Sequence, residues 1–200
     1  MSSQRWLARQ LSDPFVKQAK AEGLRSRAAF KIREIDAKFK LLQHGVKVVD
    51  IGAAPGGWSE YAAIKAGKGN VVAIDLLDMK PIDGVAFLRA DFESDEAKDF
   101  ILSELGGRAD VVLSDIAPNT TGSASLDHLQ IMALVEQAYE FALSVLSGGG
   151  AFVAKVRQGG TEAALLVRMK WDFAKVAHFK PESSRKESSE TYVVATGFRR

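Results

Sequence analysis

The chain has 200 residues, of which 46% are hydrophobic and 26% charged, a composition typical of one globular domain with a substantial core. It has no cysteine, which excludes disulfides and thiolate metal sites, and its three histidines are scattered, so we expect no bound metal. No apolar stretch reaches the roughly 20 residues that cross a bilayer, and the first ten residues lack the apolar core of a signal peptide, so we expect a cytoplasmic protein without membrane contact.

The net charge is only +2, but the charge is unevenly distributed along the chain. Residues 1–47 contain 11 Lys and Arg against 4 acidic residues, and residues 168–200 contain 8 against 4. A basic surface attracts phosphate groups by charge and by counterion release, which favours a nucleic acid as partner. The alternative is a solvated, lysine-rich surface, which an excess of this size does not exclude.

The predicted elements begin with residues 1–24, which are polar with weak periodicity and indicate a basic N-terminal arm containing a short helix. A single domain is expected over residues 25–200. Its first helix is predicted to start at Ser26, a suitable N-cap residue, because apolar residues follow at three- and four-residue spacings. We expect this helix to end at His44 and Gly45.

Short β-branched runs then alternate with helical patterns. The predicted strands are residues 46–52, 70–76, 85–91, 109–115 and 150–156, and the predicted helices are residues 58–66, 94–105, 125–146 and 160–171. This alternation predicts an α/β fold with a mainly parallel, doubly wound, Rossmann-like sheet that is covered on both faces. Residues 173–179 and 190–198 are expected to close the sheet as a C-terminal antiparallel hairpin.

Charged residues stand at the carboxyl ends of the five predicted strands, where sheets of this kind bind ligands. They are Asp50, Asp75, Asp91, Asp115 and Lys155. Burying charges without partners is costly, so five together predict a functional site. A single strand-end aspartate is more often a turn or capping residue, and that remains the better explanation of Asp50 taken alone.

A loop of small residues, Gly-Ala-Ala-Pro-Gly-Gly at positions 52–57, follows the first strand. Its spacing fits neither the G-x-G-x-x-G dinucleotide fingerprint nor a P-loop. Asp75 suits a ribose diol and Asp91 an adenine amino group, and the small residues would let a ligand approach the backbone closely. These features fit S-adenosylmethionine, which has adenine, ribose and an amino-acid tail but no phosphate, better than a dinucleotide.

The segments LRSRAAFKI, VVDIGAAPGGWSEY, AIDLLDM, SDIAPN, AFVAKV and SSRKESSETYVVATG occur in this order within residues 5–198. Together they resemble the FtsJ/RrmJ-type 2′-O-ribose methyltransferases that act on a uridine of 23S ribosomal RNA. The resemblance implies a class I methyltransferase fold and methyl transfer from S-adenosylmethionine to a ribose 2′-hydroxyl, on the assembled large ribosomal subunit. The implied reaction requires no metal.

The resemblance also implies a set of site residues. It carries over a catalytic tetrad of Lys31, Asp115, Lys155 and Glu190. Cofactor binding is assigned to Gly52, Ala54, Pro55, Gly56, Gly57, Trp58, Asp75, Asp91, Phe92 and Asp115. With the basic ends flanking this site, RNA contacts are expected from Arg25, Arg27, Lys40, Arg185 and Lys186.

The chemistry explains why a lysine is needed at position 155. A hydroxyl is a poor nucleophile until its proton leaves, and Lys155 is the candidate base. Lysine is ordinarily protonated at neutral pH, but the Lys31 ammonium and the cofactor sulfonium would favour its neutral form, while Asp115 and Glu190 oppose this. Lys31 and Glu190 would orient the ribose and Lys155.

Structural alternatives exist for the same residues. Lys31 could face solvent on an amphipathic helix, Glu190 could be a charge that protects an edge strand, and Trp58 could belong to the core. Lys155 differs, because a lysine that ends an apolar central strand is costly to bury, which favours a functional role.

Three other functions remain open at this stage. They are a methyltransferase acting on another RNA (transfer RNA or an mRNA cap), a small-molecule or protein methyltransferase on the same fold, and a non-catalytic RNA-binding factor for ribosome assembly. We expect the protein to be a monomer.

Overall fold

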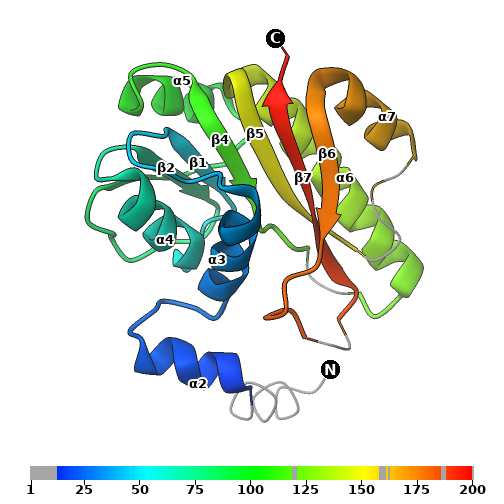
Figure 1. The fold of residues 1–200 in the computed structure, drawn as a ribbon, viewed down its shortest axis with the longest axis horizontal. Helices are drawn as coiled ribbons and strands as arrows, with labels where there is room; N and C mark the ends of the chain where they lie inside the picture. The colour runs from blue at the N-terminus through cyan, green and yellow to red at the C-terminus, as the bar shows by residue number, and fades with distance from the viewer. Residues whose placement is uncertain (1–12, 119–120, 158–160, 162, 186–187, 200) are drawn as a thin grey trace.

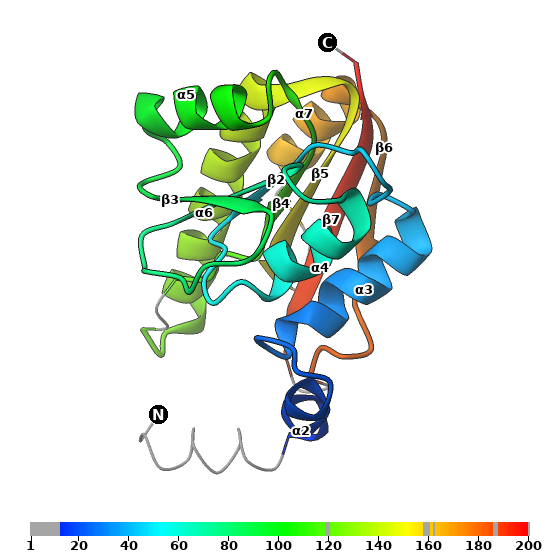
Figure 2. The same cartoon turned by 90° about the vertical axis from the view of Figure 1, so that its left-hand side faces the viewer.

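The computed structural model describes residues 13–118, 121–157, 161, 163–185 and 188–199. They form a seven-stranded sheet in the order β3-β2-β1-β4-β5-β7-β6, with helices on both faces (Figures 1 and 2). The strands are β1 (Val48–Ile51), β2 (Val71–Asp75), β3 (Val85–Arg89), β4 (Ala109–Ser114), β5 (Leu146–Arg157), β6 (Phe173–Phe179) and β7 (Glu190–Phe198). The helices are α2 (Pro14–Ala21), α3 (Ala28–Phe39), α4 (Gly57–Ala66), α5 (Asp95–Glu104), α6 (Ala124–Val145) and α7 (Ala163–Asp172).

The first five strands are parallel, and β7 is antiparallel to both of its neighbours, β5 and β6. This confirms the predicted doubly wound sheet with a C-terminal antiparallel hairpin. The prediction did not include the insertion of β7 between β5 and β6. Burial explains it, because residues 192–195 of β7 are buried on both faces, whereas β6 has exposed residues typical of an edge strand.

Each face of the sheet has its own core. Helices α5, α6 and α7 cover one face, where Tyr139, Phe152 and Phe173 are fully buried. Helices α3 and α4 cover the other face, where Ile32 packs in a cluster that includes Trp58. The site residues of α3 and of the strand ends are therefore held by two packed layers.

The bounds of α3 differ from those predicted. The N-cap position is Arg27, and the hydroxyl of Ser26 is instead buried against Gly57. The helix ends at Phe39, where Lys40 adopts a left-handed conformation with φ of 56°. The chain then turns so that the amide of Leu42 donates to the side chain of Asp36 at 2.8 Å, which is why the helix stops before His44.

The described part of the N-terminal segment is the short helix α2, next to the start of α3 (Figure 1). Asp13 caps α2 by accepting a hydrogen bond from the amide of Phe15 at 3.0 Å. The ring of Phe15 lies 5.4 Å from that of Phe30 in α3. Within the described residues, no helix combines the length and apolar character needed to cross a bilayer.

Candidate active site

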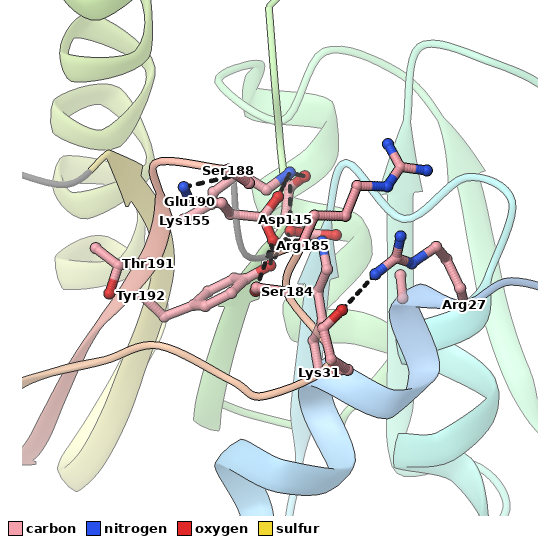
Figure 3. Close-up of polar contacts among 12 residues, drawn as sticks. Arg27, Lys31, Asp115, Lys155, Ser184, Arg185, Ser188, Glu190, Thr191 and Tyr192 are labelled. Carbon is pink, nitrogen blue, oxygen red and sulfur yellow. Dashed lines mark hydrogen bonds and ion pairs between the residues drawn. The ribbon is translucent and has the colours of Figure 1, made fainter. Parts of the chain in front are cut away.

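Four side chains meet near the carboxyl ends of β4 and β5 (Figure 3). Lys31 comes from the first turn of α3, and Glu190 is the first residue of β7. Asp115 follows β4 and Lys155 lies in β5; the pairing of Ser114 with Ala154 places them side by side. The structure therefore brings together the four residues that the resemblance assigns to a tetrad.

Ion pairs link the four side chains. The Lys155 Nζ lies 2.9 Å from Asp115 Oδ1 and also donates to the Asp115 main-chain carbonyl at 2.7 Å. The Lys31 Nζ lies 2.6 Å from Glu190 Oε1, and Glu190 Oε2 is 4.0 Å from Lys155 Nζ. These side chains are only 11–19% exposed, so solvent screens their charges weakly.

Tyr192 is a member of this network that the sequence analysis missed. Its hydroxyl lies 2.7 Å from Asp115 Oδ1, to which it donates, and 3.4 Å from Glu190 Oε1. Burial, together with the charges of both carboxylates, raises the pKa of Tyr192 well above its ordinary value. The alternation of a strand could have revealed it, because residues 190 and 192 of one strand face the same side.

Opposing effects act on the carboxyl group of Asp115. Burial raises its pKa, but the ammonium groups of Lys155 and Lys31 and the hydrogen bonds from Lys155 and Tyr192 lower it by more. The pKa of Asp115 is therefore below its ordinary value. We conclude that this group is ionised at neutral pH and holds the Lys155 side chain in place.

The glycines of the loop after β1 lie against the protein itself. A Cβ on Gly52 would approach Ile116 Cγ1 to 2.2 Å, and a Cβ on Gly57 would approach Ser26 Oγ to 2.3 Å. At Gly56 it would come within 2.8 Å of the side chains of Met79 and Ile82. Packing therefore gives a structural reason for glycine at these three positions. A cofactor contact from their backbone stays a prediction.

The strand ends nearby fit an adenosyl group. Asp75 accepts the amides of Ala54 and Leu77, each at 2.8 Å, which fixes its carboxylate at the end of β2. Asp91 is exposed after β3. Because a carboxylate has about four acceptor sites, both can accept further hydrogen bonds from hydroxyl or amino groups. The 65% exposed Leu76 adds apolar surface next to Asp75.

Two aromatic residues assigned to the cofactor pack against the protein. The Trp58 side chain is almost completely buried, and its indole nitrogen donates to the Ala28 carbonyl at 2.9 Å. The Phe92 ring packs edge-on against Phe141, with 5.5 Å between ring centroids. The geometry of Trp58 favours the alternative in which its side chain belongs to the core.

Asp50 is buried at the end of β1 and contacts helix α4. Its Oδ2 accepts a hydrogen bond from the Ser59 hydroxyl of α4 at 2.6 Å. Within the described residues, Oδ1 has no hydrogen-bond partner. Burial, with a smaller contribution from Asp115 and Asp75, raises the pKa of Asp50 to about 7.

The residues expected to contact RNA are mostly engaged in contacts within the protein. Arg27 and Arg185 both pair with Asp13, and Arg25 pairs with Glu60 at 3.7 Å. Lys40 is exposed, but it follows the end of α3 that is farther from Lys31. Lys186 lies outside the described residues.

Comparisons with known proteins show the family of this chain. Residues 24–198 match the FtsJ-like methyltransferase family. A protein named Ribosomal RNA large subunit methyltransferase E from Bradyrhizobium diazoefficiens is 57% identical, over 100% of this chain and 89% of its own. The protein of the same name from Granulibacter bethesdensis is 56% identical, over 100% and 86%. The crystal structure of a proposed ribosomal RNA methyltransferase from Plasmodium falciparum superposes with a TM-score of 0.76 and 29% identity, over 87% of this chain and 98% of its own.

Proposed function

This chain belongs to the FtsJ-like methyltransferase family, and from that premise we propose that it transfers a methyl group from S-adenosylmethionine to the ribose 2′-hydroxyl of a uridine in 23S ribosomal RNA. Relatives that are more than half identical over almost the whole chain, each named as a large-subunit ribosomal RNA methyltransferase, support the class of reaction and of substrate. The position of the methyl group on the ribose and the choice of uridine are finer proposals.

One observation carries this proposal, namely the convergence of two lysines and two carboxylates in one linked network. Lys155 is held between Asp115 and Glu190, and Lys31 is paired with the same Glu190. A carboxylate pair alone would serve many reactions. A lysine whose side chain is only 11% exposed, fixed at the carboxyl edge of the sheet, is suited to receiving a proton from a hydroxyl group.

The cofactor would be held by Asp75 and Asp91, through its ribose hydroxyls and its adenine amino group, and by the backbone of residues 52–57. When bound, S-adenosylmethionine supplies a methyl carbon activated by a positively charged sulfur.

The residues of the chain then act on the ribose. Lys155 accepts the proton of the 2′-hydroxyl at Nζ, and Lys31 is linked to Lys155 through their shared partner Glu190. Asp115 fixes Lys155 through its carboxylate and its carbonyl oxygen. Glu190 and Lys31 orient the hydroxyl, and this positioning supplies much of the rate.

The remaining assignments are part of the same proposal. The substrate is the assembled large ribosomal subunit, the protein acts as a monomer in the cytoplasm, and it needs neither a metal nor a membrane. Residues 1–24 form the basic arm, and residues 25–200 form the methyltransferase domain.

The test is methyl transfer from labelled S-adenosylmethionine to large subunits from cells that lack this gene, followed by mapping of 2′-O-methyl groups. We expect label at one uridine of 23S RNA and a loss of at least about 100-fold in Lys155→Ala, the range typical of a general base. Lys175→Ala, which removes an exposed lysine of β6, is the matched control and should retain full activity. Label in protein or in transfer RNA, or full activity of Lys155→Ala, would contradict the proposal.

A further inference from the structure

The loop of residues 181–185, which leads into Glu190, is held on α3 by the carboxylate of Glu34. Glu34 lies one turn after Lys31 on the same helix. Its Oε2 accepts a hydrogen bond from the amide of Glu182 at 2.5 Å, and its Oε1 accepts one from the amide of Ser183 at 3.0 Å. One side chain of α3 therefore fixes two consecutive peptide groups of the loop.

A second carboxylate, that of Asp13, holds the same loop from the N-terminal segment. Asp13 Oδ2 pairs with Arg27, at the start of α3, and lies 3.1 Å from the Nε of Arg185 in the loop. Arg27 also donates to the carbonyl oxygen of Ser183. The Asp13 side chain is only 5% exposed, so these charge-assisted contacts are shielded from water.

The held loop in turn contacts the active site. The hydroxyl of Ser184, which is buried, donates to Glu190 Oε1 at 3.1 Å. The same oxygen pairs with Lys31 at 2.6 Å (Figure 3). The orientation of the Glu190 carboxylate is therefore set jointly by α3, through Lys31, and by the loop, through Ser184.

We propose that Glu34 and Asp13 are positioning residues for Glu190, acting through the loop of residues 181–185. The inference rests on the proposed function, because it takes Glu190 to orient the reacting groups. Glu34 fixes the distance between the loop and the helix that carries Lys31, and Asp13 couples helix α2 to the same loop. We call Glu34, Asp13 and the loop of residues 181–185 that they hold the clamp. A displacement of about 1 Å in a catalytic group can lower the rate up to about 100-fold, so we expect the clamp to affect the chemical step.

The first experiment compares the kinetics of Glu34→Ala with those of Glu22→Ala. The expected result for Glu34→Ala is a fall in kcat of about tenfold, with KM for the ribosomal RNA substrate unchanged within about twofold. Glu34→Gln keeps an acceptor oxygen and should restore part of the loss. Glu22 forms an exposed ion pair with Arg33, next to Glu34 on α3, and its removal should leave kcat unchanged.

The second experiment asks whether Glu34 acts through Glu190. In the Glu190→Gln background, we expect Glu34→Ala to cause no further loss of kcat, because the group that it positions is already impaired. If the double variant instead showed the product of the two separate losses of kcat, the proposal would be overturned and Glu34 would have a separate, structural effect. Full kcat in Glu34→Ala would overturn it as well.

A third measurement does not depend on activity. Amide hydrogen exchange should accelerate at Glu182 and Ser183 in Glu34→Ala, and at Ser183 in Asp13→Asn, which keeps the cap of α2 but removes the charge. Unchanged exchange rates at these amides would overturn the proposal that Glu34 and Asp13 hold the loop. If the wild-type protein transferred no methyl group while these amides responded as expected, the proposed function would fail and the clamp would stand.

Discussion

Asp50 is a carboxyl group buried at the end of β1, and its environment disfavours the ionised form. Burial raises its pKa from 3.8 to about 7, and the hydrogen bond from Ser59 opposes this only in part. Between these two pH values the folded protein holds a proton that the unfolded chain has released. The free energy of unfolding contributed by Asp50 therefore falls as pH rises from about 4 to about 7.

This predicts that Asp50→Asn becomes more favourable as the pH is raised. The neutral amide resembles the protonated carboxyl group, but at pH 5 the unfolded wild-type chain has already released its proton, so the variant should lead there by about 1–2 kcal/mol. At pH 8 the variant should exceed wild type by about 2–4 kcal/mol, because each unit of pKa shift corresponds to about 1.36 kcal/mol. Urea unfolding of both proteins at the two pH values measures the difference. Asp83→Asn, at an exposed position, should show no such trend, and a larger advantage of Asp50→Asn at pH 5 than at pH 8 would contradict the assignment.

At the scale of elements, the connection between β1 and α4 depends on the missing side chain of Gly52. Its φ is +71°, and a Cβ there would also overlap Ile116. Gly106 has a similar φ of +60° but open space around it. The two positions therefore separate the cost of the left-handed backbone from the cost of overpacking.

We expect Gly106→Ala to lower the free energy of unfolding by about 1 kcal/mol, the strain of a left-handed residue. Gly52→Ala should cost about 3 kcal/mol, because overpacking adds to the same strain. Urea unfolding without cofactor measures both. Equal losses would mean that Ile116 moves aside freely and that packing does not explain the glycine.

The elements themselves could largely be predicted from the sequence, because buried parallel strands and covering helices leave different apolar patterns. The position of β7 in the sheet could not be predicted, because the apolar pattern of a strand does not show which strands are its neighbours. The N-cap of α3 was predicted wrongly at Ser26 because the hydroxyl contacts α4, a contact that local sequence does not contain.

The residues of the candidate site could be predicted where they lie within the motifs of the family. Lys31, Asp115, Lys155 and Glu190 were identified by resemblance, and their spacing along the chain would not have joined them. Glu34 and Asp13 were missed, since their role depends on a loop that is 149 and 172 residues away in sequence, respectively. Such partners follow from tertiary packing alone.

At the scale of the whole molecule, the fold brings together charges that are far apart in sequence. Helix α2 and the loop of residues 181–185 lie at the same end of the sheet, beside the tetrad (Figure 1). Arg27 and Arg185, one basic residue from each basic segment, therefore meet there. Asp13 neutralises part of this charge by pairing with Arg27 and Arg185, so we expect a share of the RNA attraction to come from basic residues outside that cluster.

Arg5 and Arg9, in residues 1–12, are the basic residues that precede Asp13 in the chain. If they neutralise RNA phosphates, binding should release counterions, and the slope of log affinity against log salt should fall in magnitude by up to about 1.4 when both are lost. Deletion of residues 1–12 leaves Asp13 in place and should give this change, measured as RNA affinity over a salt series.

Replacement of both arginines by glutamine keeps the length of the segment and Trp6, and should change the slope equally. A larger loss of affinity in the deletion than in the double substitution, at the same slope, would be the contribution of stacking by Trp6. A slope identical to wild type in both proteins would contradict the assignment, because phosphate contacts cannot be removed without changing the number of counterions released. The attraction would then come from residues at the tetrad end of the sheet.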